Sequence, residues 1–334
     1  MRVNYVIKRI GFLVIVVWAA ATINFFLPRV SGQNPIRERM LKQIAVGSSV
    51  MQGIEEMIKH YDAKFGLDKP LWQQYLVYLG DVVRLDFGES ITFYPRRVKD
   101  IIADGMPWTI GLLTLSTLSS FIIGSLFGAL IAWPRSPGWL QWFAPPVITL
   151  SAIPYYLLGL VLLFIFAFEL KWFPGRGGYT LGQIPRWSWV FAFDTLKHAV
   201  LPAASIVLSA VGFWALGMRG MMVSVEGEDY MTMAEAKGLK ARTRFLHYAL
   251  RNTLLPQTTS LALSLAYVAS GSILVEIVFS YPGIGYTLYN AILGVDYPVI
   301  NGLVMTLILT LALSTLLLDL ALPLLDPRIT YARS

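Results

Sequence analysis

Cysteine is absent from this 334-residue sequence, and charged residues make up only 14% of it. Without cysteine the chain has no disulfide, no thiolate metal site and no cysteine nucleophile. The three histidines, His60, His198 and His247, lie far apart and form no HExxH-like pair, which disfavours a metalloenzyme. The sequence contains no GxxxxGKS or GxxxxGKT stretch, so this chain cannot hold the phosphates of ATP in such a loop by itself.

Apolar residues dominate the composition. Hydrophobic side chains account for 56% of the sequence, and they gather in blocks long enough to cross the hydrocarbon core of a bilayer. Lys and Arg outnumber Asp and Glu by 27 to 20, which gives a formal net charge of +7. In a membrane protein such an excess is typical of the inward-facing loops that set topology. We therefore expect an integral membrane protein and no nucleic-acid partner.

The first apolar run, 10–27, follows a basic start formed by Arg2, Lys8 and Arg9. A secretory signal peptide has a similar basic start and apolar centre, but it ends in small residues at a cleavage site. This run ends instead in two phenylalanines, a leucine and a proline. Residues 1–27 are therefore expected to form a cytoplasmic start and a retained first transmembrane helix.

Residues 28–105 are polar and of mixed charge, which predicts a small external domain between the first two spans. Within it, Pro70 suits the first turn of a helix. The apolar and aromatic residues that follow recur at helical spacing and predict an amphipathic helix: Leu71, Tyr75, Tyr78, Leu79 and Val82.

Five further apolar runs predict an all-α bundle of six transmembrane helices. The second span is expected to begin at Pro107, because proline is tolerated in a first helical turn. The third span contains Pro145, Pro146 and Pro154, which remove backbone donors and predict a kink. A second external loop, 169–197, is rich in Gly and Trp. The second to sixth spans are expected at 107–133, 140–168, 199–218, 256–279 and 298–325.

The distribution of basic residues predicts the orientation. The long domain 28–105 is left out of the comparison, since long domains cross the membrane largely regardless of charge. Six spans place both termini on the same side, and twelve Lys and Arg residues on that side face four on the other. The twelve are Arg2, Lys8, Arg9, Arg135, Arg219, Lys237, Lys240, Arg242, Arg244, Arg251, Arg328 and Arg333, and the four are Lys171, Arg176, Arg186 and Lys197. Both termini are therefore expected in the cytoplasm.

A polar segment, 219–255, separates the fourth and fifth spans. Asp229 can cap a short helix, and Gly238 is placed to end that helix in a left-handed conformation. A second helix is expected from about residue 243. Helices of this composition can simply rest on lipid headgroups, so spacing alone does not assign a function to the segment. The first helix places four side chains on one face: Tyr230, Met233, Ala234 and Lys237.

Several stretches of the chain resemble the dipeptide and oligopeptide permease family of ABC importers. In the polar segment they are AEAKGL and HYALRNTLLP, which look like that family's cytoplasmic coupling loop. Elsewhere they are GLDKPLWQQYLVYLGDVVRLDFGESITFYPRRVKDII, LKHAVLP, VEIVFSYPGIGYTLYNAILGVDYPVI and LLDPRI, so the resemblance covers most of the chain. The general coupling motif has Glu, Ala, Ala and then Gly four positions after the second Ala. Aligned on Gly238, this chain has Thr232, Met233 and Ala234, so only the second Ala matches.

The resemblance implies a non-catalytic permease of a prokaryotic plasma (inner) membrane, with a coupling helix between the fourth and fifth spans. Its implied partners are a second homologous permease, two ABC ATPases that bind ATP and Mg²⁺, an external solute-binding protein and membrane lipid. No cofactor is implied for this chain. Residues 106–325 would be the permease core and 326–334 a cytoplasmic tail. The residues implied to contact an ATPase are Asp229, Tyr230, Met233, Ala234, Lys237, Gly238 and Arg242.

Few side chains suggest what is carried. Glu276 and Asp319 lie within expected spans, where ionisable residues are candidates for the translocation path. Trp187 and Trp189 lie in the second external loop, where they can face the binding protein or stack on a sugar ring. The family default is an oligopeptide, and an oligosaccharide such as cellobiose is nearly as well supported. Nickel is disfavoured because the spans contain almost no histidine.

Two other classes of membrane protein remain as alternatives. An ion-coupled secondary transporter needs an ion or proton relay, which two scattered acids and the lack of an evident repeat disfavour. An intramembrane hydrolase needs a serine and a histidine facing one cavity, but His198 and His247 lie at expected span boundaries. Both alternatives would act without an ATPase.

Overall fold

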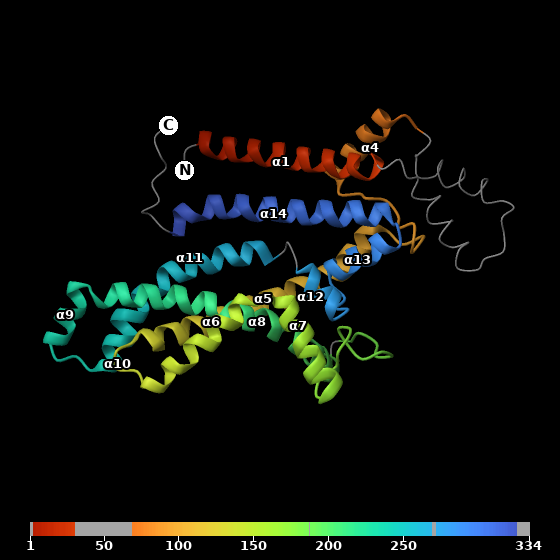
Figure 1. Cartoon of the computed structure of the whole chain (residues 1–334). Coiled ribbons are helices and arrows are strands. Elements are labelled where there is room, and N and C mark those ends of the chain that lie inside the picture. Colours follow the sequence, from red (N-terminus) through yellow and green to blue (C-terminus); the bar gives the residue numbers. More distant parts are fainter. Residues whose placement is uncertain (1–2, 31–68, 187, 269–271, 326–334) are drawn as a thin grey trace. The chain divides into compact units, whose positions relative to one another are not determined.

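The computed structural model describes residues 3–30, 69–186, 188–268 and 272–325 (Figure 1). These residues form helices joined by loops, and the only strand-like pairing among them is an isolated bridge between Glu89 and Arg97. The expectation of an all-α chain is therefore confirmed for the described part. Residues 31–68 of the expected external domain lie outside it.

Four of the described helices are long and apolar enough to cross a membrane, and a bent pair of helices supplies a fifth candidate. The four apolar spans are Tyr5–Phe26, Val98–Ala132, Trp189–Glu226 and Tyr297–Leu320. The expected fifth span falls on α11 (Arg251–Tyr267) and α12 (Ile273–Val278), and residues 269–271 between them lie outside the described residues. The count of six spans stays a prediction.

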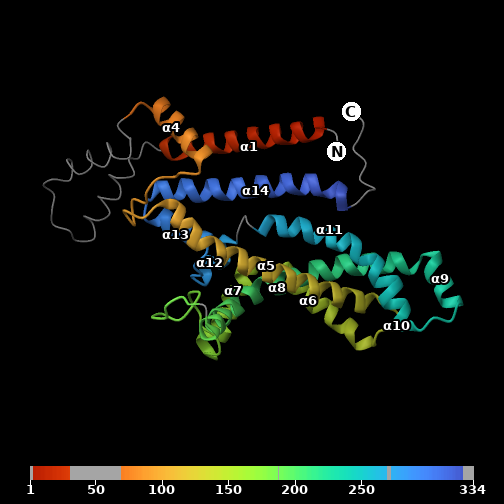
Figure 2. The same ribbon diagram turned by 180° about the vertical axis from the view of Figure 1, so that it is seen from behind.

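The helices divide into two compact units, and α5 (Val98–Ala132) runs from the first into the second. The first unit contains α1 (Val3–Val30), α4 (Leu71–Arg84), α13 (Ile284–Leu293) and α14 (Tyr297–Leu325). Its helices α1 and α14 lie side by side and antiparallel (Figures 1 and 2). Helix α4 begins directly after Pro70, as its spacing predicts.

A buried carboxylate organises the loop of the first unit that leads into α5. Asp296 is 1% exposed and accepts hydrogen bonds from Ser90 Oγ and from the backbone N–H groups of Ile91 and Thr92, at 2.5 to 3.1 Å. Its backbone carbonyl accepts from Ile300 N in the first turn of α14. One side chain therefore fixes the loop at 90–92 against the start of α14.

The second unit is built on α8 (Trp189–Glu226), against which α5, α6 (Ala144–Ala152), α7 (Tyr155–Leu162) and α11 pack. Glycines allow the backbones to approach closely. A Cβ on Gly124 would lie 2.6 Å from Trp214 Cβ, and one on Gly128 would lie 2.9 Å from the carbonyl carbon of Ala215. Glycines four residues apart on one helix face are a common means of helix association in membranes.

The expected third span is not one straight helix. The 3-10 helix η1 (Gly138–Phe143) and α6 lead to a bend of 104°, after which α7 and the π-helix η2 (Leu163–Glu169) continue. Pro154 lies at this bend as the residue before α7, so the predicted kink is confirmed there. Pro145 and Pro146 instead lie in the first turn of α6, where they cost no hydrogen bond.

Two helices begin earlier than the apolar runs indicate. Helix α5 begins at Val98, so Pro107 lies inside it, and the expectation that Pro107 opens the span is wrong. Val98 and Ile101 are buried, which stabilises this polar first part of the helix. Helix α8 begins at Trp189, ten residues before the apolar run at 199, because Ser188 caps it by accepting a hydrogen bond from Phe191 N at 3.2 Å.

The Gly128→Ala substitution should destabilise the second unit. The added methyl group would overlap the Ala215 carbonyl group, and such overpacking costs about 1–3 kcal/mol. Gly111→Ala on the same helix is the matched control, because no atom lies within 4 Å of its added Cβ. Thermal unfolding of the purified protein in nanodiscs should show a lower midpoint for Gly128→Ala alone. Equal midpoints for the two variants would contradict the close crossing of α5 and α8.

Candidate functional site

A short helix, α9 (Asp229–Ala236), lies in the polar segment where the sequence predicts one. Its N-cap is Glu228, in an extended conformation, and Asp229 is its first helical residue. The expectation that Asp229 is the N-cap is therefore wrong by one residue. The Glu228 carbonyl accepts hydrogen bonds from Met231 N and Thr232 N, and no side chain caps this end. Asp229 still places a negative charge beside the positive end of the helix dipole.

Gly238 ends this helix with φ of +71°, the left-handed conformation that its position predicts. Its N–H donates to Glu235 O, and the N–H of Leu239 donates to Ala234 O. Apart from Gly238 and its two chain neighbours, no atom of the described residues lies within 4 Å of a Cβ built on Gly238. The turn after α9 is therefore sharp and leaves open space beside it.

The face of α9 that packs on the rest of the chain is centred on Met231 and Ala234, which are 7% and 2% exposed. Tyr230 is half-buried, and its hydroxyl accepts a hydrogen bond from Asn252 Nδ2 at 3.1 Å. Met233 is 60% exposed, and Lys237 is exposed as well. The four side chains expected on one face are thus divided. Ala234 packs inward, whereas Met233 and Lys237 face outward together with Asp229 and Gly238.

Met231 belongs to an apolar cluster drawn from four elements. The buried members are Ala129 of α5, Met218 and Met222 of α8, Met231 of α9 and Ala249 of the π-helix η3 (Arg244–Leu250). Trp133 and Phe245 pack edge to face on the border of this cluster, with ring centroids 5.2 Å apart. The cluster fixes α9 to the ends of the long helices α5 and α8.

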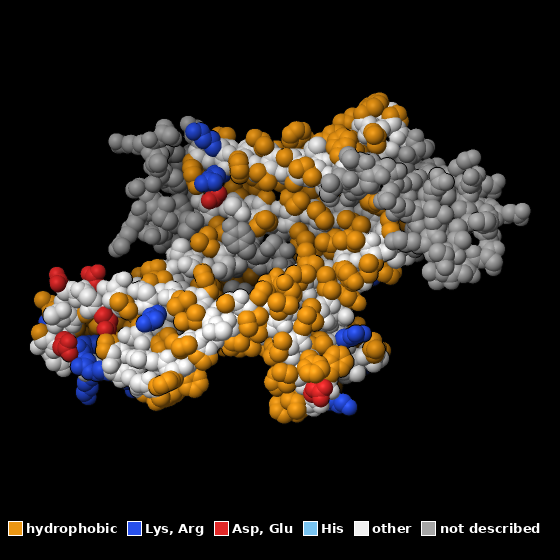
Figure 3. All heavy atoms as spheres, viewed as in Figure 1, with side chains coloured by type: hydrophobic (Ala, Val, Ile, Leu, Met, Phe, Trp, Pro, Cys, Tyr) orange, Lys and Arg blue, Asp and Glu red, His pale blue; other side chains and the backbone are white. Residues whose placement is uncertain are grey.

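Charged groups lie beside the last turn of α9. Glu235 Oε1 lies 2.8 Å from Nη1 of Arg244 and 3.1 Å from Nη2 of Arg135. Arg242 is exposed, as a residue that meets a partner or lipid should be. Arg244 differs, because it is 6% exposed and faces Glu235. Acidic and basic side chains gather at the end of the second unit where α9 lies (Figure 3).

A groove of about 250 Å³ opens beside this charged group. Its walls come from the turn after α5, the end of α8, helix α9 and η3. The lining residues are Trp133, Pro134, Arg135, Glu226, Met231, Thr232, Glu235 and Arg244. The groove is therefore bordered by two basic and two acidic side chains.

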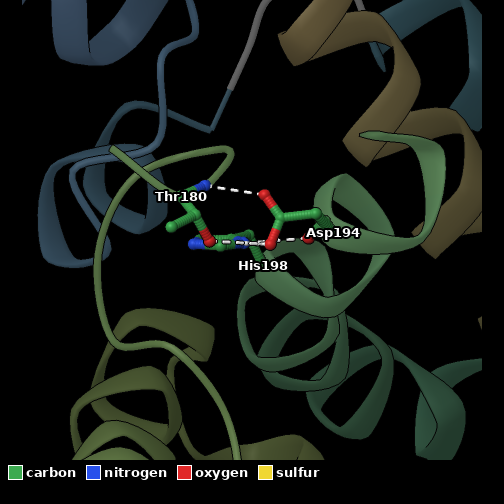
Figure 4. Close-up of polar contacts among 3 residues, drawn as sticks. All are labelled: Thr180, Asp194 and His198. Carbon is green, nitrogen blue, oxygen red and sulfur yellow. Dashed lines mark hydrogen bonds and ion pairs between the residues drawn. The ribbon is translucent and has the colours of Figure 1, made fainter. Parts of the chain in front are cut away.

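A second polar cluster joins Thr180, in the loop before α8, to Asp194 and His198 of α8 (Figure 4). Asp194 of α8 accepts hydrogen bonds from Thr180 N at 2.7 Å and from Thr180 Oγ1 at 2.8 Å. His198 Nδ1 lies 2.8 Å from the backbone carbonyl oxygen of Asp194, one turn earlier. Trp189, the first residue of α8, is 92% exposed, whereas Trp187 lies outside the described residues.

The two candidate acids of the translocation path have partners within the chain. Glu276 of α12 is fully buried and accepts a hydrogen bond from Thr109 Oγ1 of α5 at 2.7 Å. Asp319 of α14 lies 2.8 Å from Nη1 of Arg9 on α1. Both acids therefore join helices that are distant in the sequence. The sequence alone does not indicate either partner, although Arg9 directly precedes the first apolar run.

Comparison with known proteins identifies the family. Residues 124–331 match the model of the binding-protein-dependent transport system inner membrane component, which covers more than half of the chain. The chain belongs to this family. Its curated relatives place it further among the dipeptide and oligopeptide permeases of ABC importers, as the motifs indicate.

Three relatives illustrate how far the similarity extends along this permease. A probable peptide ABC transporter permease of Sinorhizobium fredii is 34% identical over 282 residues, which cover 83% of this chain and 86% of that protein. A dipeptide transport system permease of Bacillus subtilis is 32% identical over 328 residues, which cover 98% of this chain and 97% of that protein. A glutathione transport system permease of Escherichia coli is 30% identical over 332 residues, which cover 98% of this chain and 99% of that protein.

The site residues that sequence reasoning missed are Glu235, Arg135 and Met231. Glu235 was visible one position after Ala234, but its two arginine partners are nine and one hundred residues away along the chain. Arg135 was used only as a topology signal. Met231 was omitted because helical spacing gives relative directions around α9 and not the direction in which its apolar neighbours lie.

The Thr109→Val substitution should test whether Glu276 is a structural residue of this permease. It removes a hydrogen bond to a buried carboxylate while keeping the side-chain shape, and such a bond contributes about 1.5–3 kcal/mol. The thermal midpoint of the purified transporter should fall, whereas competition assays should give an unchanged order of preferred solutes. Thr114→Val on the same helix is the control. An altered solute preference at an unchanged midpoint would instead place Glu276 in the translocation path.

Proposed function

We propose that this permease forms half of the translocation path of an ATP-driven, binding-protein-dependent importer in a prokaryotic inner membrane. A second homologous permease forms the other half, two ABC ATPases bind ATP and Mg²⁺ on the cytoplasmic side, and a solute-binding protein delivers the solute from outside. Six spans and cytoplasmic termini are part of the proposal, supported by the excess of Lys and Arg on one side. Residues 28–105 form an external domain, and 219–255 a cytoplasmic coupling loop.

Helix α9 is the proposed contact with an ATPase. The observation that carries this assignment is the division of its surface. Met231 and Ala234 hold the helix against its own chain, whereas Met233, Lys237 and Asp229 remain exposed beside an open turn at Gly238. An eight-residue helix is not stable alone in water. Its packing against α5, α8 and η3 therefore presents a rigid and exposed ridge to a partner.

Short peptides are the proposed solutes. Relatives that match 98% of this chain are named as dipeptide and oligopeptide transport system permeases. Gluco-oligosaccharides such as cellobiose are the second candidate, favoured by the exposed Trp189 at the start of α8. An indole ring that is 92% exposed can stack on a sugar ring or contact a binding protein.

The Gly238→Trp substitution should abolish transport and leave membrane insertion intact. The described residues leave space beside Gly238, so the indole ring is expected to clash with a partner that packs there, in addition to straining the left-handed turn. Gly238→Asn is the matched control, because asparagine tolerates the left-handed conformation and is small. Transport into proteoliposomes should be retained in the Asn variant only. Normal transport by Gly238→Trp would refute the coupling assignment.

Reconstitution should identify the class of solute. The permease is assembled in liposomes with the second permease, the ATPases and the binding protein from its genetic neighbourhood. ATP hydrolysis and uptake are then measured with panels of dipeptides to pentapeptides and of gluco-oligosaccharides. Peptides should stimulate both activities, and stimulation by sugars alone would overturn the peptide assignment. Uptake that persists without the ATPases would overturn the ABC mechanism and favour an ion-coupled transporter.

A further inference from the structure

Glu235 is the point at which three separate segments of the second unit meet. It lies in the last turn of α9, and its Oε1 contacts the guanidinium groups of Arg135, in the turn after α5, and Arg244, the first residue of η3. Contacts from one carboxylate oxygen to two basic groups fix both the position and the direction of the helix end. The sequence motif had not assigned any function to Glu235.

The two ion pairs of Glu235 differ in how deeply the arginine side chain is buried. The side chain of Arg244 is 7% exposed, whereas that of Arg135 is 52% exposed. Within the described residues, Nε of Arg244 is buried and has no hydrogen-bond partner. The Glu235 carboxylate therefore supplies the counter-charge for a guanidinium group that is shielded from water. The Glu235 side chain itself is 61% exposed, so the Glu235–Arg244 pair is only partly buried. Removing Glu235 leaves the buried charge of Arg244 uncompensated, whereas the exposed pair with Arg135 contributes little.

A groove lies beside these residues, so apolar side chains do not fill the space around the ion pairs. About 250 Å³ lies open between α9, the turn after α5 and η3, and Arg135, Glu235 and Arg244 all line it. Met231, one turn before Glu235 on α9, also lines the groove and packs in the apolar cluster. Helix α9 is thus held by apolar packing at Met231 and by ion pairs at Glu235.

We propose that Glu235 is a positioning residue that joins the coupling helix to α5 and η3 through Arg135 and Arg244. This inference rests on the proposed coupling function of α9. When an ATPase displaces α9, the ion pairs carry the displacement to the turn after α5 and to η3, which leads directly into α11. Without them, α9 moves about its apolar contacts and less of the displacement reaches the transmembrane helices.

The test measures how many solute molecules enter per ATP hydrolysed by the full transporter in proteoliposomes. Glu235→Gln should lower this ratio about fivefold, a size typical of residues that transmit coupling between sites. The ATPases should co-purify with the variant in normal amounts, because Glu235 acts within the permease. The charge-swapped pair Glu235→Arg with Arg244→Glu should recover part of the ratio, since it restores the pair between positions 235 and 244 while Arg135, which is half exposed, turns toward water.

Glu228→Gln is the matched control, because it removes one acidic charge from the N-cap of the same helix, where the side chain makes no capping bond. A normal ratio in Glu235→Gln would overturn the proposal, as would a low ratio that the charge swap does not restore. Loss of ATPase co-purification would overturn it too, because Glu235 would then be part of the docking surface. Gly238→Trp is assayed alongside, and normal transport by that variant would refute the coupling function itself.

Discussion

Close backbone contact around α8 is the constraint on which the second unit depends. Lipid chains are as apolar as leucine, so helices within a bilayer gain little from the hydrophobic effect when they associate. They gain from close packing, which glycine permits. Gly124 and Gly128 bring α5 against α8, and Gly212 of α8 lies where a Cβ would be 2.9 Å from the carbonyl oxygen of Val147 on α6. The N–H of Gly212 also donates to Ser151 Oγ at 2.8 Å. A polar bond thus reinforces that contact.

Polar side chains within the apolar helices contribute to helix association for the same reason, since the hydrophobic effect contributes little within the bilayer. An ionisable group in hydrocarbon is costly unless a partner satisfies it, so it persists where it contributes a specific contact. Arg9 and Asp319 pair between α1 and α14, and Thr109 donates to Glu276 between α5 and α12. In each case one contact joins segments that are distant in the sequence. Both acids that the sequence marked as candidates for the translocation path thus have a partner within the chain.

Local chemistry was the part of the structure that could be predicted from sequence. Proline opens α4, Pro154 lies at the bend before α7, and Gly238 adopts the left-handed conformation, because these features depend on a residue's own backbone preferences. Helix beginnings were predicted less well. Hydropathy marks the part of a helix that meets lipid, whereas α5 and α8 begin with polar turns that are stabilised by burial or by a cap.

The candidate site likewise combines local features, which the sequence predicts, with contacts between distant segments, which it does not. Spacing predicted that α9 exists and where it ends, since helix formers and a terminal glycine are local signals. It could not predict that Ala234 faces inward, because the inward direction is set by Met218 and Met222 of α8. Nor could it pair Glu235 with Arg135, which lies one hundred residues earlier. Contacts between distant segments depend on how the helices cross, and those crossings depend on close contacts such as the one at Gly128.

In the proposed coupling function, an ATPase transfers free energy through α9 by apolar packing as well as by charge. Reversing a population from mostly inward-open to mostly outward-open takes about 5.5 kcal/mol of differential binding. Exposed ion pairs contribute about 0–1 kcal/mol each, so a partner that held α9 by surface charges alone could not deliver this free energy. Packing against the exposed Met233 can contribute more. In this proposal the displacement then reaches α8 through Met231, which packs in the same cluster as Met218 and Met222. Since α8 is also the helix against which α5 and α6 pack, a shift at its α9 end reaches the glycine contacts that hold the unit together.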